Sequence, residues 1–151
     1  MMSRIDRNDV YKLQPTLVTA LTSLGEAAGR EIEAPLVHLL HLRISQLNGC
    51  AFCQHMHAAE ARQDGEQQQR LDVLAAWQET TFFSARERAA LRWAEALTLL
   101  AGQPVSDAVY SELAAQFSQL EIVNLSAVIV TMNAWNRIAV GFQFQPQLTS
   151  D

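Results

Sequence analysis

The chain has 151 residues, of which 49% are apolar and 18% are charged, as is typical of one globular domain with its own core. The net charge of −5 and the lack of a basic run argue against a nucleic-acid-binding surface. No apolar stretch approaches the roughly 20 residues that cross a bilayer, and none near the start resembles a signal peptide. We therefore expect a single domain over residues 1–151, cytoplasmic, with no nucleic-acid or membrane partner.

Apolar residues recur at helical spacing through the first half of the chain and predict four helices. Pro35 suits the first turn of one of them, and Asn48-Gly49 marks its end. Gly65 suits the C-terminal stop of another. The predicted ranges are 8–28, 34–48, 50–65 and 66–77.

Three further helices are predicted in the second half, and their starts are marked by serines. Ser84 with Glu87, and Ser118 with Glu121, have the spacing of a capping box, while Ser106 suits a simpler N-cap. No strand alternation is evident. The predicted fold class is therefore all-α, with about seven helices. The three ranges are 84–100, 106–117 and 118–142.

The last predicted helix is apolar on several faces. A helix of this kind is either central to the fold or covered by a second subunit. Because a compact chain of this size offers limited surface to cover it, we expect a homo-oligomer. The apolar positions are Ile122, Leu125, Val128, Ile129, Val130, Met132, Trp135, Ile138 and Val140.

Every cysteine and histidine of the chain falls between positions 38 and 57. These are the side chains that reach nucleophilic, acid–base or metal chemistry most easily near neutral pH. In a cytoplasmic protein, a Cys-x-x-Cys pair indicates redox chemistry or metal binding rather than a structural staple. The segment is therefore the first candidate for an active site. It holds His38, His41, Cys50, Cys53, His55 and His57.

The spacing of the two cysteines and His57 suits thiol chemistry. If a helix begins near Cys50, the sulfur of Cys53 lies one turn further on, close enough for a disulfide after small adjustment. His57 follows Cys53 by four residues, on the same face, where an imidazole can take the thiol proton. The unfilled amides of the helix start favour negative charge on Cys50. Spacing alone does not determine which sulfur attacks first.

Zinc is the main alternative at this segment. Cys50, Cys53 and His57, with either His38 or His41, would make four ligands of ordinary type. Structural zinc usually pairs Cys-x-x-Cys with a second, similarly spaced pair, and this chain has none.

Other prominent side chains have structural interpretations. We expect His41 to be a partly buried structural histidine and His55 to be exposed or in an interface. The remaining large side chains are expected in the core, namely Phe52, Met56, Trp77, Trp93 and Trp135.

The segment HLRISQLNGCAFC at residues 41–53, followed by His57, resembles the core motif of the alkylhydroperoxidase D-like (AhpD-like) branch of the carboxymuconolactone decarboxylase family. The likeness covers roughly residues 15–145. It continues through the blocks at residues 74–77, 83–91, 93–98 and 133–137.

This resemblance implies an AhpD-like helical bundle that assembles as trimers or hexamers and acts as a thiol-dependent peroxidase. Cys53 would attack the peroxide and become a sulfenic acid, and Cys50 would condense with it to a disulfide. His57 would relay the proton. A dithiol reductant of the dihydrolipoyl or thioredoxin type would restore the thiols, with no metal or organic cofactor. Family members that act as decarboxylases lack the paired cysteines.

One position departs from the family pattern. Where the family often has a glutamate twelve residues before the first cysteine, this chain has His38. An imidazole brings no fixed negative charge to support an imidazolium at His57, so we expect a weaker or shifted proton relay, with His38 as its candidate member. The alternatives are a non-catalytic redox sensor or interaction protein, and a zinc-binding helical protein.

Overall fold

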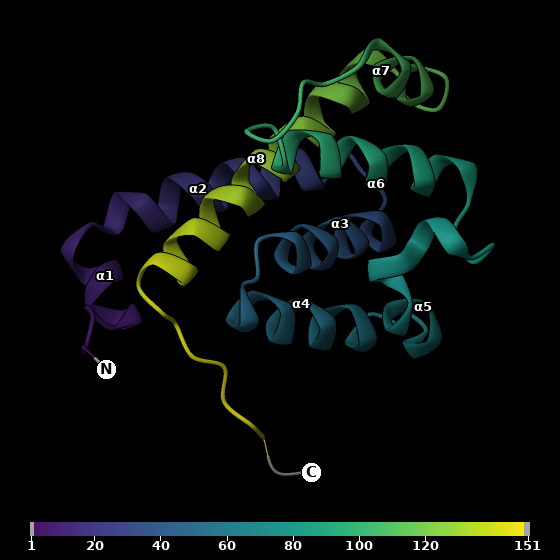
Figure 1. The fold of residues 1–151 in the computed structure, drawn as a ribbon. Helices are drawn as coiled ribbons and strands as arrows, with labels where there is room; N and C mark the ends of the chain where they lie inside the picture. Colours follow the sequence, from purple (N-terminus) through teal and green to yellow (C-terminus); the bar gives the residue numbers. More distant parts are fainter. Residues whose placement is uncertain (1, 150–151) are drawn as a thin grey trace.

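The computed structural model describes residues 2–149, which form eight α-helices and one 3₁₀ helix, with no strand among them (Figure 1). The all-α class predicted from the sequence is confirmed. The helices are α1 (Arg7–Leu13), α2 (Pro15–Gly29), α3 (Ala34–Leu47), α4 (Ala51–Gln63), α5 (Gln68–Asp72), η1 (Leu74–Glu79), α6 (Ala85–Thr98), α7 (Asp107–Ala114) and α8 (Gln119–Gly141).

Two of the predicted helices are each divided in the structure. The expected helix over 8–28 breaks at Gln14 because Pro15 has no N–H with which to continue it. The Gln14 side chain instead caps α2 by accepting the Thr16 amide at 3.3 Å. The expected helix over 66–77 becomes α5 and η1, separated at Val73.

Helix α3 lies at the centre of the bundle, between α4 and α6 (Figure 1), and also packs against α8. Helix α2 packs against α8, and α7 packs against α6. Burying a leucine or isoleucine side chain stabilises the fold by about 1.5–3 kcal/mol, so the completely buried α3 face is a major contribution. That face consists of Leu36, Leu39, Leu40 and Ile44.

The predicted serine caps are all present, although one capping box is incomplete. Ser118 and Glu121 form both reciprocal hydrogen bonds of the box. Ser84 accepts the Glu87 amide at 3.1 Å, but the Glu87 carboxylate binds Arg70 at 2.7 Å instead of reaching back. The side chain therefore ties α5 to α6 rather than completing the cap. Ser106 caps α7 as expected.

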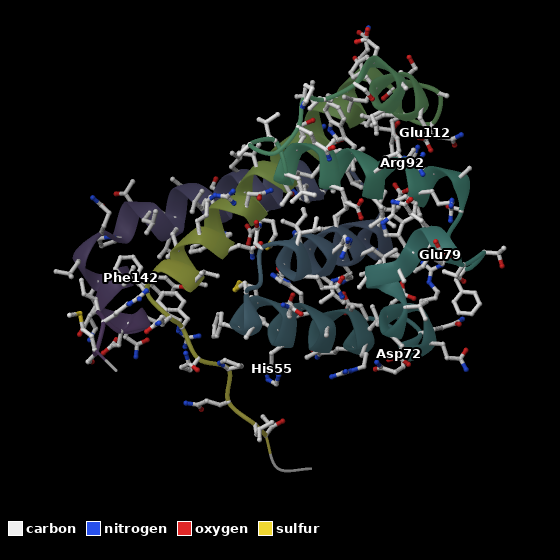
Figure 2. All side chains as sticks on the ribbon, viewed as in Figure 1. His55, Asp72, Glu79, Arg92, Glu112 and Phe142 are labelled. Carbon is white, nitrogen blue, oxygen red and sulfur yellow. A yellow bond between two sulfur atoms is a disulfide. The ribbon has the colours of Figure 1, made fainter. Side chains whose placement is uncertain are left out.

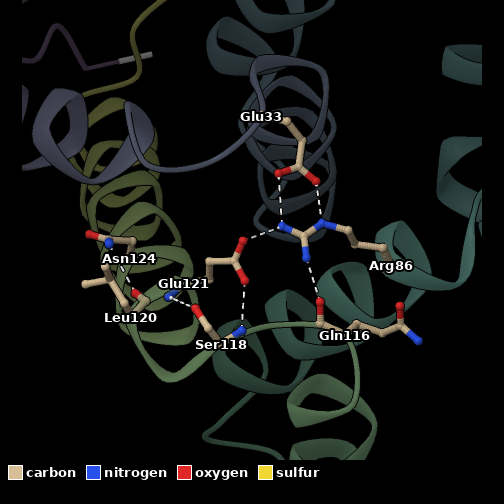
Figure 3. A network of polar contacts seen from close by, with 7 residues as sticks. All are labelled: Glu33, Arg86, Gln116, Ser118, Leu120, Glu121 and Asn124. Atoms are coloured by element: carbon tan, nitrogen blue, oxygen red, sulfur yellow. Dashed lines mark hydrogen bonds and ion pairs between the residues drawn. The ribbon is translucent and has the colours of Figure 1, made fainter.

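Arg86 joins three helices through one guanidinium (Figure 3). It donates to Glu33 at 2.6 and 3.2 Å, to Glu121 at 2.8 Å and to the backbone oxygen of Gln116 at 2.6 Å. Its charge also lies 4.0 Å from the ring centroid of Phe117. The starts of α3, α6 and α8 are thereby held together.

One face of helix α8 packs into the core, and another face is exposed. Leu125, Val128 and Ile129 are buried in the core, whereas Val123 and Val130 are largely exposed. Taken singly, no helix of residues 2–149 is long and apolar enough to span a membrane. The pair of α7 and α8, with a 120° bend between them, has the length and the apolar composition of a span only when the two helices are counted together.

The Arg86 network gives a testable prediction. Arg86→Ala is expected to lower the free energy of unfolding by about 1–3 kcal/mol, because two carboxylates lose their shared partner. Hydrogen bonding to Arg86 lowers the pKa of both Glu33 and Glu121 below 4.5. Their stabilisation is present above pH 4.5 and is lost as the pH falls through the folded-state pKa.

Urea unfolding at pH 7 and pH 3.5 would check this. The variant should lose less stability than the wild type between the two pH values. Arg137→Ala is a matched control, since Arg137 is exposed and, among residues 2–149, its side chain bonds Asn133 alone. Equal unfolding energies for Arg86→Ala and the wild type at pH 7 would contradict the prediction.

Candidate active site

The turn between α3 and α4 places the two cysteines. Gly49 has a φ of +65°, a left-handed conformation that glycine adopts without strain. The amides of Gly49 and Cys50 donate back to Gln46 and Ser45 at 3.2 and 3.0 Å, which completes a Schellman motif at the end of α3. Cys50 is then the N-cap of α4, and its sulfur accepts the Cys53 amide at 3.2 Å.

This turn is anchored to α8 by amide side chains. Asn48 donates to Asn133 at 3.0 Å and to Asn136 at 2.9 Å. Asn136 is completely buried and donates to the Ser45 hydroxyl at 3.1 Å. Because these buried polar groups are paired with one another, the turn has one favoured position against α8.

Cys50 and Cys53 form a disulfide, with their Cα atoms 5.3 Å apart. The two residues are only 2% and 3% exposed. They belong to a small second core that also includes Val10 of α1, Ala139 of α8 and Phe144 of the C-terminal tail. Both ends of the chain therefore cover the sulfur atoms.

Aromatic rings form much of this cover. Phe144 is at its centre, with ring centroids 6.0 Å from Tyr11 and 5.7 Å from Phe52. A left-handed residue, Gln143, ends α8 in a second Schellman motif, in which the Phe144 amide donates to Ala139 at 2.9 Å. This turn directs Phe144 back over the start of α4. We call Tyr11, Phe52, Phe142 and Phe144 the aromatic cap.

A cavity of about 1000 Å³ opens beside the disulfide, between α2, α3, α4 and α8. Cys53 lines it, whereas Cys50 does not. Most of its wall is apolar, from side chains such as Val18, Val37 and Trp135. The wall also carries histidines and the charged side chains of Arg7, Glu26, Arg30 and Glu60, and a mainly apolar wall with a few polar groups is common in small-molecule sites.

Three histidines and Glu60 line the cavity from α3 and α4, and Asp64, just after α4, binds one of these histidines. His57 bonds Glu60 through Nδ1 at 3.0 Å, and His38 bonds Asp64 through Nε2 at 2.6 Å. The His41 ring packs against the His57 ring, and the two ring centroids are 4.7 Å apart. His57 and His38 thus each have their own carboxylate partner.

The protonation of this cluster follows from burial and charge. Burial, with the nearby charges of His57 and His38, lowers the pKa of His41 to about 3, so His41 is neutral near pH 7. The hydrogen bond from His57 lowers the pKa of Glu60, which is therefore ionised. An ionised carboxylate can only accept, so His57 donates its Nδ1 proton to it.

The sequence-predicted site residues are brought together, with one change of partner. Cys53, His57 and His38 all line the cavity, and Cys50 is bonded to Cys53. His38, however, hydrogen-bonds Asp64 rather than His57, and its buried Nδ1 has no partner among the described residues. His55 is exposed, as expected, and points away from the bundle (Figure 2).

His41 is partly buried, as expected, and it also lines the cavity against His57. Three residues expected in the core, Phe52, Met56 and Trp135, line the cavity instead. Trp77 is buried as expected, while Trp93 packs partly buried against the core.

Sequence reasoning missed Glu60 as the partner of His57. The available signal was the spacing of His57 and Glu60, three residues apart on a predicted helix, which places them on one face. Asp64 was missed because it follows the end of α4, where its direction depends on the turn. Within residues 2–149, no three His, Cys, Asp or Glu side chains are arranged to hold a metal ion, so the four-ligand zinc arrangement is not formed.

The fold and the bonded cysteine pair define a class, the AhpD-like helical proteins. Residues 15–96 match the model of the carboxymuconolactone decarboxylase family, and the chain belongs to this family. It is 41% identical over 102 residues to the uncharacterized protein YdfG of Bacillus subtilis, covering 68% of this chain and 69% of YdfG. It is 32% identical over 95 residues to the uncharacterized protein YnjA of Escherichia coli, covering 63% and 52%.

Among solved structures, the chain is similar to ATU0492 of Agrobacterium tumefaciens, a protein of unknown function proposed to be the antioxidant defence protein AhpD. The TM-score is 0.90 at 36% identity, covering 98% of this chain and 100% of ATU0492. The debrominase Bmp8 shares the fold, with a TM-score of 0.77 at 20% identity over 90% of this chain and 74% of Bmp8.

The buried His41 predicts a specific pH dependence of stability. Between pH 6.5 and its folded-state pKa of about 3, unfolded His41 binds a proton that the folded residue does not, so stability falls as the pH falls. His41→Gln should remove about 1–2 kcal/mol of the stability lost between pH 7 and pH 5. Urea unfolding at both pH values measures this. His55→Gln, at an exposed position, should keep the wild-type dependence, and an unchanged dependence in His41→Gln would refute the prediction.

The aromatic cap predicts slow reduction of the disulfide. An attacking thiolate must reach a sulfur atom, and Cys50 and Cys53 are only 2% and 3% exposed, with Phe144 packed against them and lining the cavity beside Cys53. Phe144→Ala should therefore increase the rate of reduction by dithiothreitol several-fold, as followed by thiol titration. Phe82→Ala is the control, since that ring is exposed and lies outside the cap. Equal rates for Phe144→Ala and the wild type would show that the cap does not limit access.

Proposed function

We propose that the protein is a thiol-dependent peroxidase or disulfide oxidoreductase that reduces hydroperoxides with the Cys50–Cys53 pair. The observation that carries this proposal is the bonded cysteine pair at the wall of an apolar cavity, with a histidine one helical turn after the inner cysteine. Family membership and the similarity to ATU0492 support it.

The chemistry requires two thiols and one base. His57 takes the Cys53 proton, and the thiolate attacks the terminal oxygen of R–O–O–H. The S–O bond forms as the O–O bond breaks, giving a sulfenic acid and an alkoxide that receives the proton. The Cys50 thiolate then displaces hydroxide from Cys53, which leaves with a proton as water. One hydroperoxide becomes an alcohol, and two thiols become a disulfide.

Position distinguishes the roles of the two cysteines. Cys53 lines the cavity, where a peroxide would enter, so it is the attacking thiol. Cys50 does not line the cavity, and its sulfur accepts an amide at the α4 start. Amides at a helix N-terminus favour a thiolate, so Cys50 is the resolving residue. His38, through the largely exposed Asp64, is the outer proton relay.

The partners follow from this cycle and from the surface. A dithiol of the dihydrolipoyl or thioredoxin type would reduce the disulfide, in the cytoplasm. The exposed apolar side chains of α8, Val123 and Val130 among them, would be covered in a trimer or hexamer.

The central prediction concerns the two cysteines. One equivalent of an alkyl hydroperoxide should convert the reduced protein to a species lighter by two hydrogen atoms, detected by intact mass measurement. Cys53→Ser should abolish this reaction, whereas Cys50→Ser should stop at a sulfenic acid that a sulfenic-acid-specific label traps. Steady-state turnover with several dithiol donors completes the test. Two unchanged thiols at saturating peroxide would overturn the proposal.

The burial of the disulfide favours a second candidate, a redox sensor. A disulfide covered by both chain ends would be reduced slowly, and its state would alter the packing of those ends. Slow single turnover, no reduction by dihydrolipoyl or thioredoxin-type donors, and a redox-dependent change of size on gel filtration would favour the sensor.

A further inference from the structure

His57 has one clear hydrogen-bond partner, and it comes from its own helix. Glu60 follows three residues later, and its Oε2 lies 3.0 Å from Nδ1 of His57. The other ring nitrogen, Nε2, forms no hydrogen bond with the described residues. Since the tautomer of a histidine is determined by the bond that one nitrogen makes, this contact holds the proton on Nδ1 and leaves the Nε2 lone pair available.

The other titratable groups near His57 do not offer this contact. From α3, His41 is neutral near pH 7 and His38 is bonded to Asp64. The remaining charged or titratable side chains of the cavity are Glu26 and Arg30 from α2 and Arg7 and Tyr11 from α1, and none of them hydrogen-bonds His57. Helix α8 brings no titratable side chain to the cavity wall.

The surroundings of the pair suit a positioning role. The His57 side chain is 7% exposed, while that of Glu60 is 47% exposed. The imidazole is thus fixed inside the cavity, and the carboxylate remains partly in water, where its charge is easily kept. Water also screens that charge, so the effect should be smaller than that of a fully buried carboxylate.

We propose that Glu60 is the positioning residue for His57, holding the proton on Nδ1 so that Nε2 is left as the base in the cavity that Cys53 also lines, and stabilising the imidazolium once it forms. This inference rests on the proposed function for its kinetic consequence. The carboxylate expected from the family pattern at position 38 is then supplied from α4 by Glu60. His38 and Asp64 form a separate pair.

The first experiment needs no peroxide. Long-range ¹H–¹⁵N spectra of the reduced protein, at a pH where His57 is neutral, report which ring nitrogen carries the proton, with His57→Gln identifying the signal. The wild type should show the Nδ1–H form. Glu60→Ala should lose this preference and Glu60→Asp should retain it in part. An Nε2–H form in the wild type would overturn the proposal.

The second experiment measures the rate of Cys53 oxidation in a single turnover across pH 5 to 9. Glu60→Ala and Glu60→Gln should lower the rate constant by about tenfold, the lower end of the usual range for partners that orient a functional histidine. The acid limb of the profile should move to lower pH, because an imidazolium without its carboxylate partner gives up its proton more easily. Glu60→Asp should restore much of the rate.

Two further variants identify the cause. Glu79→Gln removes one negative charge from an exposed position far from the cavity (Figure 2) and should match the wild type. Asp64→Asn should reduce the rate less than Glu60→Gln does; a larger effect at Asp64 would mean that the His38 pair is the working one and would overturn the proposal.

The two experiments test the positioning role of Glu60 and the proposed peroxidase function separately. If the Nδ1–H tautomer depends on Glu60 but the thiols do not react with peroxide, the peroxidase function is contradicted and the positioning role of Glu60 stands. If Glu60→Ala reacts with peroxide at the wild-type rate and with the wild-type pH profile, the positioning role of Glu60 is contradicted and the peroxidase function stands.

Discussion

The left-handed turn at Gly49 is the constraint on which the site depends. It ends α3 and allows α4 to run back along it, so that a single turn of chain places Cys50 as the cap of the second helix. Both sulfurs then lie at a helix N-terminus, one of them accepting a first-turn amide. The same reversal brings the α3 histidines opposite His57. The hydrogen bonds of Asn48 to α8 hold this turn against the core.

The site combines an apolar cavity with a compact set of titratable groups. His41, kept neutral by burial, lies near two histidines that each have a carboxylate partner. Positive charge can therefore develop on either of those two imidazoles without a second fixed cation beside it. The arrangement suits a reaction in which one proton leaves a thiol and returns to a product alkoxide, since no net charge has to remain in the apolar wall.

Access to the sulfur atoms is governed by the ends of the chain. Helix α1 and the tail after α8 are far apart in sequence, yet Tyr11 and Phe144 meet over the disulfide. A peroxide would approach Cys53 through the cavity, whereas a reducing protein must reach a sulfur that the aromatic cap covers. The two half-reactions of the proposed cycle therefore have different structural requirements. Oxidation by peroxide requires a formed cavity beside Cys53, and reduction by a protein requires the aromatic cap to open.

Much of this protein was determined by local sequence. Helix ends follow from serine caps and from Gly49 and Gly65, and the phase of Cys50, Cys53 and His57 follows from helical geometry, because each depends on residues within one or two turns. The break at Pro15 belongs to the same class, although the apolar spacing concealed it. Tertiary structure alone decided that His38 pairs with Asp64, that His41 lies against His57, and that Phe144 covers the disulfide. These contacts depend on how separate helices, turns and chain ends meet, and spacing along one helix carries no information about that.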